Sequence, residues 1–124
     1  MFQQDFIVRQ VQQLAEVLAR VLFHKRAADE AEAQEALSNG LAAALGLGLD
    51  ALRTLSRDGL VARYAPEGAM SVEMAVAVAE VLQEDAQRAG RLRALWLYEA
   101  ALASGAPVPF DIHERIDLLR EELG

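Results

Sequence analysis

Residues 94–102, Ala-Leu-Trp-Leu-Tyr-Glu-Ala-Ala-Leu, decide the fold class of this 124-residue chain. Ala94, Tyr98 and Ala101 follow one another at helical spacing, so their side chains share one side of a helix. Small residues on that side let a second helix come close. Pro107 follows and cannot continue the helix, because proline has no amide hydrogen. The stretch predicts a helix over residues 91–103 that packs tightly against a helical neighbour.

Helices are also predicted on both sides of this stretch. Before it, Ser71 is expected to cap a helix that is apolar nearly all round, and Gly90 is expected to end that helix in the left-handed conformation. After it, Asp111 and Glu114 form a capping-box pattern at the start of a last helix. The last helix is expected to bury four apolar residues: Ile112, Ile116, Leu119 and Leu123.

The N-terminal part of the sequence predicts a helical hairpin over residues 1–48. Residues 6–23 carry an apolar stripe with the period of an amphipathic helix, and Asp5 is its expected N-cap. A second helix is expected to begin at Asp29, with Glu32 reaching back in a capping box, and to end near Gly46 and Gly48. Small residues that allow close packing recur along this second helix: Ala33, Ala36, Gly40 and Ala43.

The remaining segments complete an all-α prediction. Residues 49–70 are expected to form a connector of short helical turns, and residues 71–124 a helix pair followed by the C-terminal helix. No stretch alternates convincingly between apolar and polar residues, so no strand is predicted. The expected fold is a single domain over residues 1–124, with about five main helices in stacked antiparallel pairs.

Two resemblances support this expectation. Ala94, Tyr98, Ala101, Leu102 and Pro107 resemble the second helix of a tetratricopeptide repeat, in which small residues and an aromatic residue let paired helices nest. A weaker version, with glycine in place of the aromatic residue, recurs at Ala36, Gly40 and Ala43. The opening MFQQDFIVRQ, with Leu45-Gly46-Leu47 leading to Leu49-Asp50, is similar to an uncharacterised bacterial family of small tetratricopeptide-like helical proteins. That similarity implies the stacked-helix fold and no particular activity.

The residue content argues against an enzyme. The chain has no Cys, and its two histidines, His24 and His113, lack the spacing of metal ligands. It also lacks a phosphate-binding glycine loop and a serine-hydrolase motif. Carboxylates at helical spacing are interpreted as a solvated surface: Glu80, Glu84, Asp85, Asp117, Glu121 and Glu122. We therefore expect no catalytic residue, no metal and no cofactor.

A cytoplasmic location is expected. The first residues show neither the basic segment nor the cleavage site of a signal peptide, and no apolar run approaches the length that spans a bilayer. The sequence therefore favours no membrane partner.

The leading functional hypothesis is a protein-interaction or scaffolding module with an unidentified protein partner. Trp96, Arg93 and Arg91 are the predicted partner-binding residues, because aromatic and arginine side chains are enriched at interface hot spots. Packing of Trp96 against a neighbouring helix is the alternative. Apolar residues outside the main stripe of the first helix, Val8, Ala15 and Val17, suggest a homodimer.

Two other functions remain open. Residues 41–63 resemble the helix-turn-helix and wing entry of bacterial transcription regulators, but Gly48 to Asp58 leaves about one turn too few for a recognition helix. The net charge of −7 also disfavours nucleic acid. The second alternative is a ligand-binding helical bundle, which requires a pocket with convergent polar groups.

Overall fold

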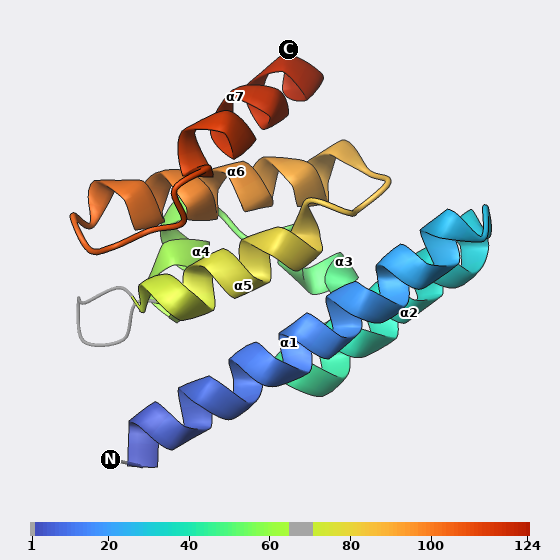
Figure 1. Cartoon of the computed structure of the whole chain (residues 1–124), viewed down its shortest axis with the longest axis horizontal. Coiled ribbons are helices and arrows are strands. Elements are labelled where there is room, and N and C mark those ends of the chain that lie inside the picture. The colour runs from blue at the N-terminus through green and yellow to red at the C-terminus, as the bar shows by residue number, and fades with distance from the viewer. Residues whose placement is uncertain (1, 65–70) are drawn as a thin grey trace.

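The computed structural model describes residues 2–64 and 71–124, with side chains from Asp5 onward (Figure 1). Within these residues the secondary structure consists of helices and contains no strand. The helices are α1 (Phe2–Arg26), α2 (Glu30–Leu45), α3 (Leu49–Leu52), α4 (Arg57–Tyr64), α5 (Val72–Leu82), α6 (Arg88–Ala103) and α7 (Ile112–Leu123). The all-α prediction is confirmed for the described part of the chain.

Helices α1 and α2 form an antiparallel hairpin with the predicted ends of α2. The Asp29 carboxylate accepts a hydrogen bond from the Glu32 N–H at 3.2 Å, and Gly46 ends α2 with φ 70° in the left-handed region. Two details of the prediction are wrong. Asp5 lies inside the first turn of α1 rather than at its N-cap, because α1 already begins at Phe2. The Asp29 N–H donates to the His24 carbonyl, not to the side chain of Glu32.

The two helices of the hairpin pack closely at Gly40, which belongs to the row of small residues singled out in the sequence. A methyl group placed on Gly40 would lie 2.4 Å from Cγ1 of Val17. Ala33 and Gly40 are buried, whereas Ala43 is exposed and Ala44 takes its place in the core. Glycine therefore sets the distance between the two helices here.

Substitution of Gly40 with alanine is expected to lower the free energy of unfolding by about 1–3 kcal/mol, because the new methyl group forces Val17 to move in a close-packed interior. Urea denaturation followed by circular dichroism measures this loss. In the background of Val17→Ala the same substitution should cost clearly less, and equal costs in both backgrounds would contradict the assigned contact.

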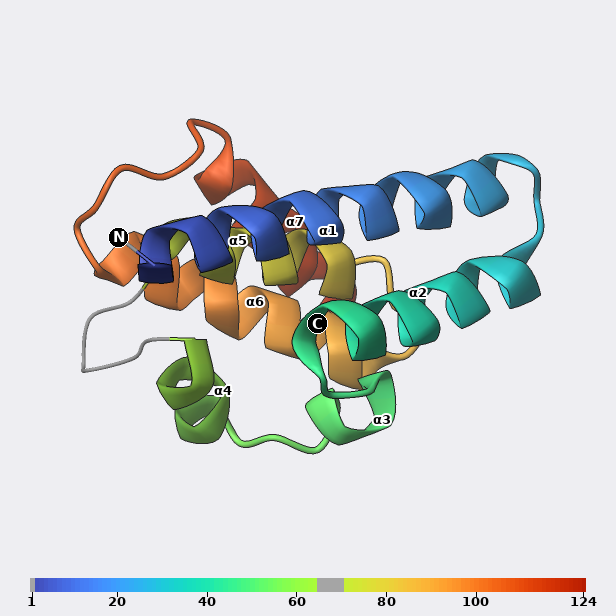
Figure 2. The same cartoon turned by 90° about the horizontal axis from the view of Figure 1, so that it is seen from below.

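The connector contains two short helices, as predicted. Helix α3 packs against α2 and α6, and α4 packs against α6 (Figure 2). Both are anchored by buried side chains: Leu49, Leu52, Leu60 and Tyr64. Part of the predicted connector, residues 65–70, lies outside the described residues.

The C-terminal half contains the α5–α6 pair and α7, but three predicted helix ends are wrong. Ser71 occupies the N-cap position of α5, but its side chain makes no capping hydrogen bond. Gly90 does not terminate α5; α5 ends at Leu82, and Gly90 lies buried in the first turns of α6. The Asp111 side chain does not cap α7 and instead contacts the guanidinium of Arg115 at 3.0 Å. Helix α7 does bury the four predicted apolar residues.

The helices follow one another in space in the order α2, α1, α5, α6 and α7, each in contact with the next (Figure 1). Helices α3 and α4 lie together on one side of this arrangement (Figure 2). Helix α5 contributes seven residues to the core, more than any other helix, which agrees with the prediction that it is apolar nearly all round. In the described residues no helix combines the length and apolar character needed to cross a membrane.

Candidate functional site

Asp85 is the buried charged residue of the part of the chain that the structure describes. Its carboxylate is 2% exposed and accepts two hydrogen bonds from Arg53, from Nε at 2.8 Å and from a terminal nitrogen at 2.7 Å. It also accepts the Gln87 N–H at 3.0 Å, just before α6 begins. The hydrogen bond with Asp85 raises the pKa of Arg53, against the effect of burial. This ion pair fixes α3 to the α5–α6 turn.

A polar cleft of about 800 Å³ opens beside Asp85, between the closed end of the α1–α2 hairpin and the α5–α6 turn. Lys25 crosses it and contacts Glu84 twice, at 3.1 Å from the carboxylate and at 2.8 Å from the carbonyl oxygen. Arg91 also lines the cleft, and its Nε is buried without a hydrogen-bond partner among the described residues, 3.9 Å from the carboxylate of Glu122. The remaining charged residues of the wall are acidic: Glu30 and Glu122. The cleft therefore offers both donors and acceptors.

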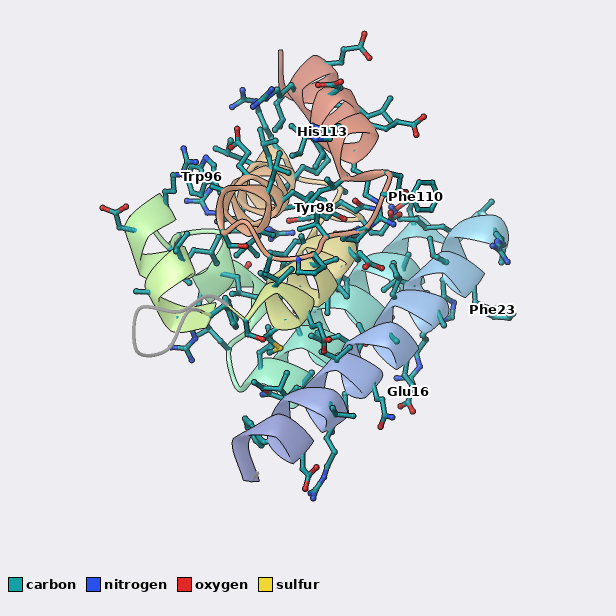
Figure 3. All side chains as sticks on the ribbon, turned by 60° about the vertical axis from the view of Figure 1, so that its left-hand side comes forward. Glu16, Phe23, Trp96, Tyr98, Phe110 and His113 are labelled. Atoms are coloured by element: carbon teal, nitrogen blue, oxygen red, sulfur yellow. The ribbon has the colours of Figure 1, made fainter. Side chains whose placement is uncertain are left out.

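The three predicted partner-binding residues are not brought together. Arg91 lines the cleft, whereas Arg93 contacts the segment between α3 and α4. Trp96 lies on the side of α6 that faces α4 (Figure 3). Arg93 donates to the Leu55 carbonyl at 3.1 and 2.8 Å, and its guanidinium carbon lies 4.7 Å from the centre of the Trp96 ring. Burial lowers the pKa of Arg93. Arg93 thus fixes the segment between α3 and α4 to α6, and Trp96 is half-buried beneath the Arg93 guanidinium.

A second cavity of about 450 Å³ was not predicted from the sequence. It lies between α1, the end of α2, the end of α4 and the start of α5, and its lining is mainly apolar: Phe6, Ile7, Gln10, Leu45, Arg63, Tyr64, Ser71 and Met74. The Tyr64 hydroxyl is buried and has no hydrogen-bond partner within the described residues. Burial raises the pKa of Tyr64. The feature of the sequence that could have pointed to this cavity is Tyr64, a residue with a polar hydroxyl on the apolar side of a short helix.

Tyr98, the aromatic residue of the repeat-like helix, is fully buried and connects three helices. Its hydroxyl donates to Oε1 of Gln83 at 2.8 Å and accepts from Arg115 at 3.4 Å. Arg115 in turn lies 3.6 Å from the carboxylate of Glu80. Burial raises the pKa of Tyr98 to about 12. This network joins α5, α6 and α7 on the side of α6 away from the connector.

The raised pKa of Tyr98 predicts a loss of stability in strong alkali. The pKa of a tyrosine in the unfolded chain is near 10, whereas the pKa of Tyr98 in the folded protein is about 12. Its contribution is therefore complete below pH 10 and is lost as the pH rises from 10 to 12, by about 2–3 kcal/mol. Urea denaturation at a series of pH values measures this slope. Tyr98→Phe should remove that part of the slope, and an unchanged slope would contradict it.

The two histidines take no part in a shared site. His24 is half-buried and packs edge-on against Phe23, and His113 lies exposed on α7 (Figure 3). Nowhere in residues 5–64 and 71–124 do three or more histidine and carboxylate side chains gather in a way that could hold a metal ion.

Comparison with protein-family models, with curated proteins and with solved structures finds no match for the chain.

Proposed function

We propose that this chain is a protein-interaction module of tetratricopeptide-like type, which binds a peptide segment of a partner in the polar cleft. The cleft of about 800 Å³ between the two helix pairs is the observation that carries the proposal. Burial of Ala94, Tyr98 and Ala101 in the α5–α6 pair, together with the contact between α1 and α5, supports the repeat-like stacking.

The chemistry of the cleft favours a peptide. A peptide backbone presents alternating donors and acceptors, and the cleft offers Lys25 and Arg91 as donors beside the acceptors Glu30, Glu84 and Glu122. Within the described residues the buried Nε of Arg91 makes no hydrogen bond, although it lies 3.9 Å from the carboxylate of Glu122, and a carbonyl or carboxylate oxygen of a bound peptide can accept its hydrogen bond. Arg91 is therefore the predicted centre of the binding site.

Affinity capture with the tagged chain, followed by titration of the recovered partner, tests this proposal. Arg91→Ala and Lys25→Ala are expected to weaken binding at least about tenfold, since each removes a charged hydrogen bond. Arg57→Ala is the matched control, because Arg57 is exposed on α4 outside the cleft. Trp96→Ala tests the other flank of α6. Failure to recover a reproducible partner, or loss of binding in Trp96→Ala but not in Arg91→Ala, would overturn the cleft assignment.

Two features support the interaction module over a winged-helix regulator. Helix α3 is four residues long, shorter than the recognition helix that reaches base edges in the major groove. Residues 57–64, where the regulator requires the start of a strand, form α4. A steeply salt-dependent shift of duplex DNA by the purified chain would reverse this ranking.

The second cavity supports small-molecule binding as a second candidate function. Its volume of about 450 Å³ lies within the range of ligand sites, and the Tyr64 hydroxyl, which makes no hydrogen bond within residues 5–64 and 71–124, lies beside an apolar lining. A ligand with an apolar body and one hydrogen-bond acceptor fits this chemistry. Displacement of an environment-sensitive dye tests it. Ile7→Trp should fill the cavity and abolish dye binding, whereas dye binding that survives this change would refute the site.

A further inference from the structure

Helix α1 has an outer face that no part of the described structure covers. The buried side of α1 carries Leu14, Val17 and Val21, and the opposite side carries exposed residues with two large apolar side chains, Val8 at 45% and Phe23 at 68% exposure. Figure 3 shows Glu16 and Phe23 projecting away from the other helices. The outer face of α1 consists of Asp5, Val8, Gln12, Ala15, Glu16, Ala19, Phe23 and Arg26.

From this face we infer that the chain forms a homodimer in which two copies of α1 pack antiparallel. In one two-fold register, Val8 faces Phe23 of the partner subunit and Asp5 faces Arg26 of the partner subunit, and symmetry repeats both contacts. Each exposed apolar residue thereby covers another, and each charge at the end of the face meets its opposite. A shift by one helical turn breaks all four contacts.

The centre of the face suits close approach of the two helices. Ala15 and Ala19 are exposed and small, so the helix axes can come near one another, with Gln12 opposite Ala19 of the partner subunit. Glu16 lies near the two-fold axis and close to its symmetry mate. Arg20, one turn along the same exposed side, offsets the repulsion between the two carboxylates.

Charge distribution favours a second copy as the occupant. The whole chain carries a net charge of −7, which opposes self-association through most of its surface. The outer face of α1 is an exception: its charged residues are Asp5, Glu16 and Arg26, and the exposed Arg20 lies at its edge, so the face is close to neutral. The outer face of α1 is therefore a place where two copies can meet without strong repulsion, and it lies apart from the residues that line the polar cleft.

Disulfide trapping tests the register, because the chain contains no Cys. Ala15 lies beside the two-fold axis, so Ala15→Cys should form a disulfide-linked dimer under mild oxidation. Ala62→Cys is the matched control, since Ala62 is exposed on α4, away from the outer face of α1. Non-reducing electrophoresis reads the result. Equal linkage in both variants, or none in Ala15→Cys, would overturn the proposal.

Charge reversal in the Cys-free chain gives an independent test in solution. Asp5→Arg and Arg26→Asp should each weaken the dimer about tenfold by placing like charges opposite one another, and the double variant should restore it. Analytical ultracentrifugation measures the dimer fraction, and circular dichroism verifies the fold of each variant. A strict monomer at high concentration, or a double variant that stays as weak as the single ones, would overturn the proposal.

Discussion

Replacement of Asp85 with alanine is expected to lower the free energy of unfolding by about 3–5 kcal/mol. The substitution leaves the guanidinium of Arg53 facing the core edge without the two hydrogen bonds that now satisfy it. It also removes the acceptor of the Gln87 N–H at the start of α6. Urea denaturation followed by circular dichroism measures the loss. Asp85→Asn should also destabilise, since it keeps the shape of the side chain but removes its charge.

Asp50 provides the matched control for this prediction. It contacts the same guanidinium, at 3.2 Å, but its side chain is fully exposed. Asp50→Ala should change stability little, because solvent screens an exposed ion pair. A joint replacement, Asp85→Leu with Arg53→Met, should recover much of the loss, because neither charge is then left unpaired. Similar effects of Asp85→Ala and Asp50→Ala would contradict the buried ion pair.

Substitution of Gly90 with alanine is expected to destabilise the fold by about 3 kcal/mol or more, since it displaces Asp85 from its position over α6. The added methyl carbon would lie 1.9 Å from Oδ2 of Asp85 and 2.6 Å from its Cγ. Two atoms cannot share that space, so the carboxylate must leave Arg53. The gain in helix propensity of alanine over glycine, about 1 kcal/mol, is too small to offset this loss.

Gly59→Ala is the control for Gly90→Ala. Gly59 also lies in a helix, but its methyl group would meet the hydroxyl of the exposed Ser56 at 3.1 Å and, at the ordinary contact distance of 3.9 Å, Cδ2 of Leu55. This variant should remain within about 1 kcal/mol of the wild-type stability. In an Asp85→Ala background the cost of Gly90→Ala should fall sharply, because the carboxylate it clashes with is gone. Strictly additive losses would show that Gly90 acts independently of Asp85.

The helices could be predicted from the sequence because their signals are local. Asp29 and Gly46 bound α2 through contacts within one turn, and the apolar spacing of α7 identifies the residues it buries. The errors arise where one residue type serves two purposes. Glycine ends a helix through its left-handed conformation or admits a close neighbour, and Gly90 does the second. The side chain of Asp111 can either cap the N-terminus of α7 or pair with Arg115 four residues later, and in the structure it pairs with Arg115.

The candidate sites were less predictable because they depend on contacts between distant segments. Asp85 was interpreted as part of a solvated surface, but its partner Arg53 lies 32 positions away in the sequence. The role of Arg93 is set by the Leu55 carbonyl, 38 positions away, which no local pattern encodes. Only the proximity of Arg93 and Trp96 follows from their spacing of three residues on one helix.

The contact between Arg53 and Asp85 has a consequence for the order of folding. Each helix pair is held by residues close in the chain, whereas this contact joins α3 to the α5–α6 turn and requires a long loop to close. Formation of the two pairs should therefore precede it, so the ion pair forms after the rate-limiting barrier. Stopped-flow measurements on Asp85→Ala should then show a faster unfolding rate and a nearly unchanged folding rate. In that case the ion pair between Arg53 and Asp85 sets the lifetime of the folded state and has little effect on the rate of folding.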